Sequence, residues 1–269
     1  MISFAARKKT VDALSRALKP LSSEQALPVG DLADAFEEAI KACAHLDLVS
    51  LAKDLKEEAE GVRLRLEKAL ASRREDLLKA AREHEFPHKR FSDYDHVGPF
   101  KISYKGRLVL LALGSERFET LSEANGAALF ELIREQANGL ECDVMPREVF
   151  FQTLKDALRL AKTMGHAEDG RVAVRALYPF VVLARQARSE AFLNKPEGRT
   201  FKDYPLTQFL YELARFGRDG WRCGDELLRT QTPNMATISQ GKTLMLPNLD
   251  AQDGTNHRIA VLWIEKREG

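Results

Sequence analysis

The stretch Pro205-Leu-Thr-Gln-Phe-Leu-Tyr-Glu-Leu-Ala-Arg-Phe-Gly217 carries the clearest helical pattern in this sequence. Its apolar side chains recur every three or four residues, as they do along one face of an α-helix. They are Leu206, Phe209, Leu210, Leu213 and Phe216. Gly217 and Gly220 favour an end to the helix, because glycine accepts the left-handed conformation of a C-terminal cap. We therefore expect a helix over 205–217 that buries one face.

Two extended runs follow this helix, at 241–247 and 257–265, and a turn-rich loop joins them. The Asp253-Gly254 pair in that loop is a common reversal sequence, so the two runs are expected to pair antiparallel. A helix followed by a twisted hairpin is the minimum of a winged helix. The sequence therefore predicts a winged-helix-like domain over 201–269.

Length and composition are those of an ordinary globular protein. The chain has 269 residues, of which 44% are hydrophobic and 30% charged, enough for two domains with buried cores. Lys and Arg number 41 against 40 Asp and Glu. The net charge of +1 therefore indicates no global attraction to nucleic acid or to a membrane surface. Any charged binding surface must be local.

The three cysteines, Cys43, Cys142 and Cys223, lie far apart and form no CxxC pair. This spacing predicts neither a disulfide framework nor a cysteine zinc site, and it favours a reducing, cytoplasmic location. No apolar run approaches the roughly 20 residues of a membrane-spanning helix. The segment 10–18 is amphipathic and does not form the continuous apolar run of a signal peptide, so we expect no signal peptide. The sequence thus predicts no membrane partner and no cofactor.

The N-terminal part, 1–85, is predicted to form a helical arm. Apolar residues from position 48 onward alternate in threes and fours, which is the heptad spacing of a coiled coil. The predicted partner-binding residues on this seam are Leu48, Leu55, Val62, Leu66 and Leu70. Two interpretations stay open. The seam belongs to a helical hairpin packed on residues 31–46, or to a coiled coil that docks on a partner subunit.

Residues 86–99 are polar and begin with Phe86-Pro87, so they are expected to form a linker between domains. The next region, 100–200, is expected to be an α+β piece. It contains a β-hairpin over 100–113 and helices, the first of which should end at Asn138-Gly139. The predicted fold class is therefore mainly α with small antiparallel β elements, an α+β fold. It has an N-terminal helical or coiled-coil arm and a C-terminal winged-helix-like domain.

The string His84-Glu85-Phe86-Pro87-His88 matches the HExxH pattern of zinc hydrolases. In those enzymes two histidines one helical turn apart bind one metal ion, and the glutamate activates water. Pro87 falls inside that turn, where it makes a continuous helix costly by ~3 kcal/mol. A metal-dependent hydrolase at His84, Glu85 and His88 is therefore an alternative. The preferred prediction has no catalytic and no metal-binding residues.

Basic side chains outnumber acidic ones between Arg171 and Arg229, and most of them are arginine. The planar guanidinium group suits bidentate contacts to phosphate. A winged helix commonly places one helix in the major groove while its hairpin touches the DNA backbone. The predicted nucleic-acid-binding residues are Arg215, Arg218, Arg222, Arg229, Lys242, His257 and Arg258. Acidic residues lie beside them, so a winged helix that docks only protein is also consistent with the pattern.

These patterns predict a non-enzymatic accessory subunit of a larger cytoplasmic assembly. The subunit would contact nucleic acid, DNA in preference to RNA, and would hold a protein partner through its helical arm. A prokaryotic DNA-processing or antiviral defence complex is the context that this architecture favours, by analogy alone. The alternative from the same architecture is a structural adaptor whose winged helix docks protein only.

Overall fold

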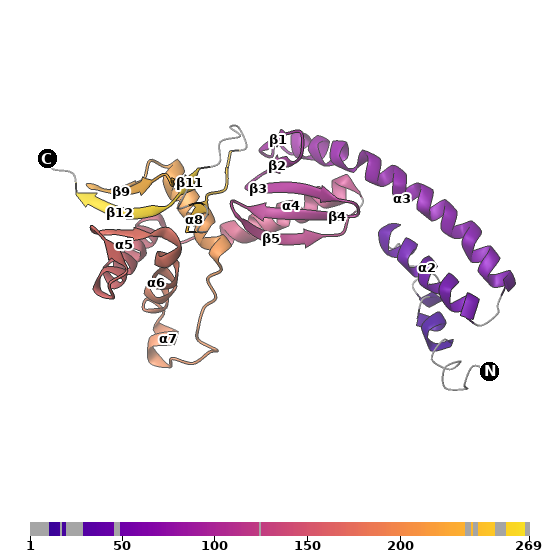
Figure 1. The fold of residues 1–269 in the computed structure, drawn as a ribbon, viewed down its shortest axis with the longest axis horizontal. Coiled ribbons are helices and arrows are strands. Elements are labelled where there is room, and N and C mark those ends of the chain that lie inside the picture. The colour runs from indigo at the N-terminus through magenta and orange to yellow at the C-terminus, as the bar shows by residue number, and fades with distance from the viewer. Residues whose placement is uncertain are drawn as a thin grey trace. The chain divides into compact units, whose positions relative to one another are not determined.

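The computed structural model describes residues 11–16, 18–19, 29–45, 49–123, 125–234, 238, 242–250 and 257–266. As predicted, the fold is α+β, with helices and sheets in one chain (Figure 1). The chain divides into two compact units. Unit 1 comprises 1–84, 104–109 and 120–132, and unit 2 comprises 85–103, 110–119 and 133–269. None of the helices in these described ranges is long and apolar enough to cross a membrane.

Unit 1 is built on two helices that lie side by side, α2 (Val29–His45) and α3 (Val49–Glu83) (Figure 1). Their apolar core consists of Leu14, Phe36, Ala39, Ala42, Cys43, Leu55 and Val62. Leu55 and Val62 belong to the heptad seam of α3 and pack in this core. The helical-hairpin interpretation of the seam accounts for that packing.

Five short strands form a first sheet in the order β1-β2-β3-β4-β5. They are β1 (His88–Arg90), β2 (Asp95–Val97), β3 (Phe100–Lys105), β4 (Leu108–Leu113) and β5 (Glu116–Leu121). The hairpin predicted over 100–113 is confirmed. The segment 86–99 was expected to be a linker, but it contains β1 and β2. Strand β2 pairs with β1 on one side and β3 on the other, and its polar residues Asp95 and His96 are buried in this sheet.

Helix α4 (Gly126–Cys142) begins at an asparagine cap and is longer than the sequence predicts. The side-chain oxygen of Asn125 accepts hydrogen bonds from the backbone N–H groups of Ala127 and Ala128, at 2.9 and 3.1 Å. The helix continues through Asn138-Gly139, which were expected to end it. Leu140, just beyond the glycine, is only 6% exposed. Burial of this apolar side chain favours the additional residues of helix.

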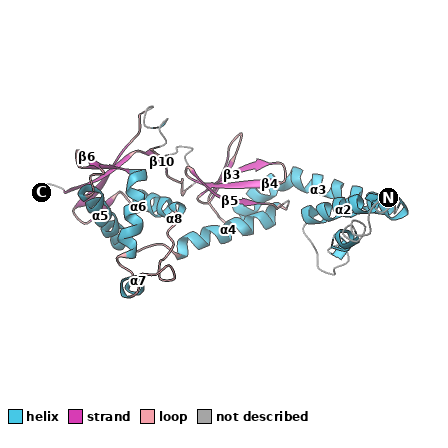
Figure 2. Cartoon of the chain, turned by 60° about the horizontal axis from the view of Figure 1, so that its bottom comes forward, coloured by secondary structure: helices cyan, strands magenta, loops and turns pink. Residues whose placement is uncertain are grey.

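The core of unit 2 lies between a group of helices and a second five-stranded sheet (Figure 2). The helices are α5 (Arg147–Thr163), α6 (Val174–Gln186) and α8 (Leu206–Arg218), with the short α7 (Glu190–Asn194) between the last two. The sheet has the order β6-β7-β12-β9-β8. Its strands are β6 (Ala167–Glu168), β7 (Arg171–Ala173), β8 (Arg222–Cys223), β9 (Glu226–Gln231) and β12 (Val261–Lys266).

Helix α8 confirms the helix predicted over 205–217. The runs predicted to pair antiparallel do so in β10 (Leu244–Met245) and β11 (Arg258–Ile259). The Asp253-Gly254 reversal lies outside the described residues. The second run continues as β12, which is the central strand of the second sheet because it pairs antiparallel with β9 on one side and β7 on the other. Neither β7 nor β9 was predicted from the sequence.

Candidate nucleic-acid interface

Helix α8 carries two of the predicted nucleic-acid-binding arginines, yet most of its surface is buried. Every residue from Gln208 to Ala214 is buried, so the helix is covered on more than the single apolar face that the sequence predicts. The end of α4 supplies part of the cover. The side-chain amide of Gln208 donates to the carbonyl oxygen of Leu140 at 3.1 Å.

The buried polar residues of α8 are satisfied by hydrogen bonds inside the core. The Glu212 carboxyl group accepts from the Tyr204 hydroxyl at 2.6 Å and from the backbone N–H of Met145 at 3.0 Å. Burial raises the pKa of Glu212 above its ordinary value, and the hydrogen bonds that it accepts oppose this rise. Burial also raises the pKa of Tyr204. This part of α8 therefore serves the interior of the domain.

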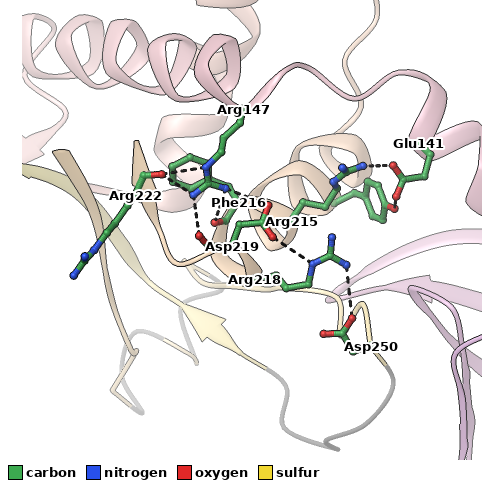
Figure 3. Close-up of polar contacts among 9 residues, drawn as sticks. Glu141, Arg147, Arg215, Phe216, Arg218, Asp219, Arg222 and Asp250 are labelled. Atoms are coloured by element: carbon green, nitrogen blue, oxygen red, sulfur yellow. Dashed lines mark hydrogen bonds and ion pairs between the residues drawn. The ribbon is translucent and has the colours of Figure 1, made fainter. Parts of the chain in front are cut away.

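Arg215 and Arg218 at the C-terminal end of α8 are already paired with carboxylates (Figure 3). The guanidinium of Arg215 bonds to Glu141, whose other oxygen accepts from the Tyr211 hydroxyl. The guanidinium of Arg218 lies 3.6 Å from carboxylate oxygens of both Asp219 and Asp250. A phosphate that approached either arginine would compete with these carboxylates.

Arg147, the first residue of α5, fixes the C-terminal end of α8 (Figure 3). Its guanidinium donates to the carbonyl oxygens of Phe216, Asp219 and Arg222 at 3.3, 3.2 and 2.6 Å. It also pairs with the Asp219 carboxylate at 3.3 Å and lies 4.1 Å from the centre of the Phe216 ring. A cation at this position satisfies carbonyl groups that a helix end leaves unpaired and opposes the helix dipole.

Arg222 and Arg229 meet at a cavity of about 160 Å³ on the second sheet, together with Leu227 and Glu265. The side chain of Arg222 points away from the cluster around Arg147 (Figure 3). Nε of Arg229 donates to Glu265 at 2.8 Å, and the Arg229 side chain keeps 51% of its surface exposed. These two arginines are therefore more accessible than Arg215.

The remaining predicted residues lie near β10 and β11. Lys242 and His257 are exposed, whereas Arg258 is half-buried in β11. The ring of His257 lies 6.0 Å from that of Trp221, and both rings line a cavity of about 250 Å³ with Arg218. The structure thus brings together Arg218 with His257, and Arg222 with Arg229, at two different cavities.

Sequence patterns did not predict a row of three side chains on the second sheet. Trp263 of β12 lies directly opposite Arg229 of β9, and the guanidinium of Arg171 from β7 lies 4.8 Å from the centre of its ring. Glu265 accepts hydrogen bonds from the indole N–H of Trp263 and from Arg229, at 2.9 and 2.8 Å. These two bonds lower the pKa of Glu265, so the group is a carboxylate at neutral pH. The sequence signal that could have indicated this outward position of Trp263 is the alternation along 257–265. It places Trp263 on the face of the sheet that faces away from the buried Leu262.

His84 and His88 do not lie one turn apart on a helix, as HExxH requires. Helix α3 ends before His84, Glu85 has a positive φ of 52°, and His88 is the first residue of β1. The His84 ring is stacked on Phe130, with 5.0 Å between centroids. Among the residues that the structure describes, no group of three or more His, Cys, Asp or Glu side chains could hold a metal ion.

The predicted partner-binding seam is largely buried in the structure. Leu48 lies outside the described residues, and Leu70 is half-buried. Leu55, Val62 and Leu66 are 9%, 1% and 8% exposed. A partner that used Leu55 or Val62 would have to displace α2, because both residues pack in the core that α2 and α3 share.

Comparison of the chain with protein-family models, with curated proteins and with solved structures found no match. Similarity to other proteins therefore contributes nothing to the functional assignment. What remains is the chemistry of the residues at the two surfaces of unit 2, the end of α8 and the outward face of the second sheet.

Proposed function

We propose that this chain is a non-enzymatic accessory subunit of a larger cytoplasmic assembly, and that its C-terminal domain is a winged helix that contacts nucleic acid. The order of elements supports the winged-helix part. The longer elements follow the order α5, β7, α6, α8, β9 and β12, with the short β6, α7, β8, β10 and β11 between them, and β12 pairs between β7 and β9. A winged helix has this order of helices and strands and this central last strand. On this proposal the domain begins at α5, earlier than the start at 201 that the sequence predicts.

We do not assign the proposed nucleic-acid contact to α8. In a helix-turn-helix protein that reads duplex DNA, the recognition helix lies in the major groove and its side chains reach the base edges. Helix α8 stands in the corresponding place in the element order, but it is buried from Gln208 to Ala214. Its arginines are engaged by Glu141, Asp219 and Asp250.

The observation that carries the proposal is the row formed by Arg171, Trp263 and Arg229 on the second sheet. Guanidinium groups bind phosphate through charge-assisted hydrogen bonds, and aromatic rings stack on bases. One arginine on each side of Trp263, on the neighbouring strands, therefore supplies both kinds of contact at one place on the sheet. DNA remains the preferred nucleic acid, and the helical arm the proposed site for a protein partner.

A second candidate function is an adaptor whose winged helix docks protein only. It is favoured by the ion pairs at the end of α8, because a surface of alternating charges suits a protein partner better than a polyphosphate. A prokaryotic DNA-processing or defence complex is a context that suits either candidate, again by analogy.

Binding of the purified full chain to a labelled duplex and to a labelled single strand, across a salt series, tests the proposal. We expect the logarithm of the affinity to fall linearly with the logarithm of the salt concentration, because phosphate contacts release counterions. The matched control is Arg159→Gln. This substitution removes the charge of an α5 arginine whose side chain is 73% exposed, and it should leave binding unchanged. Absence of binding to both nucleic acids at low salt would remove this proposal and leave the adaptor.

A further inference from the structure

The outward face of the second sheet is set by alternation along its central strand. Leu262 of β12 is fully buried, so Val261, Trp263 and Glu265 point to the opposite face. The same alternation in β9 buries Leu228 and turns Arg229 outward. The two strands therefore present their polar and aromatic side chains on one common face.

The central row of this face is organised around Trp263. Val172 pairs with Leu262, so Arg171 is the β7 residue beside Trp263, and Arg229 is its partner on β9. Neighbouring strands are spaced about 4.8 Å apart, so the three side chains span roughly 10 Å across the sheet. Glu265 holds the edge of the indole and one nitrogen of Arg229 at once. This carboxylate is a positioning residue, since it fixes both groups.

Two hollows lie at the ends of the row. One, of about 160 Å³, is lined by Arg222, Leu227 and Arg229, and the other, of about 260 Å³, is lined by His166, Arg171 and Gln231. Each hollow includes one arginine of the row. Acidic side chains line both hollows as well, Asp225, Glu226 and Glu265 in the first and Glu168 and Asp169 in the second.

We propose that this face binds single-stranded nucleic acid, with a base stacked at Trp263 and phosphates held by Arg171 and Arg229. The inference rests on the nucleic-acid contact proposed above and specifies its substrate class. Two guanidinium groups beside an aromatic ring suit a polyanion whose bases are exposed, and a phosphate at Arg229 would compete with Glu265 for its guanidinium. In a duplex the bases are stacked on one another and their faces are closed to a side chain, whereas a single strand offers them. The duplex-reading position, α8, is buried in this chain.

The guanidinium of Arg171 now lies over the Trp263 ring and would share that ring with an incoming base. In the proposed arrangement a base replaces Arg171 over the indole while Arg171 turns to a phosphate. This arrangement requires the indole and loses the stacking contact when the indole is removed.

The test compares affinities of the full chain for a labelled single strand and for a duplex of the same length. Three variants are used: Trp263→Leu, Trp263→Phe, which keeps an aromatic ring, and Phe201→Leu, which removes an aromatic ring that is 40% exposed elsewhere in the domain. Circular dichroism and thermal unfolding confirm that each variant is folded.

We expect Trp263→Leu to weaken single-strand binding by roughly 5- to 150-fold, the effect of removing a base-stacking aromatic. Trp263→Phe should fall between this variant and the original protein, and Phe201→Leu should match the original. Arg171→Gln and Arg229→Gln should each reduce the slope of log affinity against log salt by ~0.7, the value for one phosphate of a single strand.

The outcomes separate the two levels of the proposal. Duplex binding as tight as single-strand binding, with no effect of Trp263→Leu, overturns the single-strand inference but leaves nucleic-acid contact standing. Single-strand binding that survives Trp263→Leu unchanged overturns the assignment to this face. Failure of the original protein to bind either nucleic acid at low salt overturns both the inference and the proposed function.

Discussion

The end of α8 and the outward face of the second sheet both carry arginines, but the groups around those arginines differ. At the end of α8, Arg147 and Arg215 are held by carbonyl oxygens and carboxylates of unit 2. On the sheet, Arg171 lies against an aromatic ring, and Arg229 pairs with Glu265 but keeps half of its side-chain surface exposed. The difference teaches that the number of arginines in a segment does not locate a phosphate-binding surface. The partners and the exposed surface of each guanidinium together decide how available it is.

The largest expected effect tests the structural role of the α8 side. Arg147→Ala removes the bonds to two carbonyl oxygens at the end of α8 and to that of Arg222 in β8, and we expect it to lower the free energy of unfolding by about 2–3 kcal/mol. Arg171→Ala on the sheet should change it by less than about 0.5 kcal/mol, as for most exposed positions. Urea unfolding of both variants measures this. Equal losses in the two variants would contradict the distinction drawn between the surfaces.

The next effect concerns the packing behind the α8 arginines. A Cβ atom added to Gly217 would lie 2.3 Å from the Trp221 ring, so Gly217→Ala should destabilise the protein by about 1–3 kcal/mol through overpacking. Gly139→Ala is the matched control, because Gly139 also lies in a helix and a Cβ there meets nothing within 4 Å. It should stabilise the protein by about 0.5–1 kcal/mol. Thermal unfolding should show a lower melting temperature for Gly217→Ala and a higher one for Gly139→Ala. A lower melting temperature in both variants would contradict the explanation that the Trp221 ring leaves no room for a side chain at position 217.

A smaller effect distinguishes the two surfaces directly. Arg215→Gln breaks the ion pair with Glu141 in a partly exposed setting, and should cost up to about 1 kcal/mol of stability without changing single-strand affinity. Arg229→Gln breaks the more exposed pair with Glu265, and should weaken single-strand binding at a stability cost no larger than that of Arg215→Gln. Denaturation and binding measured on the same preparations decide between them. Weaker binding in Arg215→Gln would reassign the contact to α8.

The smallest effect is a dependence of stability on pH. Burial raises the pKa of Glu212 in the folded state, so between the ordinary glutamate pKa and this raised value the folded protein holds more protons than the unfolded chain. Stability therefore falls as pH rises through that window, and is greatest below it. Glu212→Gln should remove this part of the slope, which urea midpoints at several pH values would show. An unchanged slope in the variant would assign the dependence to other groups.

Local patterns in the sequence predicted the elements whose signal is strong and regular. The stripe from Leu206 to Phe216 predicted α8, and alternation predicted the hairpin over 100–113. The strands β1 and β2 were missed because Asp95 and His96 are polar residues that only the assembled sheet buries. Gly139 was interpreted as the end of a helix, but α4 continues to Cys142. Burial of Leu140 stabilises these additional residues of helix.

The candidate site was less predictable than the elements because it depends on register between distant segments. Arg229 was among the predicted residues, and Trp263 lay in a predicted strand. Their juxtaposition with Arg171 exists because β7 and β9 both pair with β12. Nothing local in the sequence specifies that pairing, since loop closure and strand partners are set by the whole core. Likewise, Arg215 could not be recognised as neutralised without knowing that Glu141 lies beside it.

The central position of β12 has a consequence for how this domain is made in the cell. Until the ribosome has synthesised residues 261–266, β7 and β9 each lack a neighbour on one side, and Val172 and Leu228 lack their partners Leu262 and Ile264. Unpaired strand edges readily join other chains. During synthesis β7 and β9 therefore each expose an unpaired edge until β12 joins them, and such edges favour aggregation of the incomplete domain.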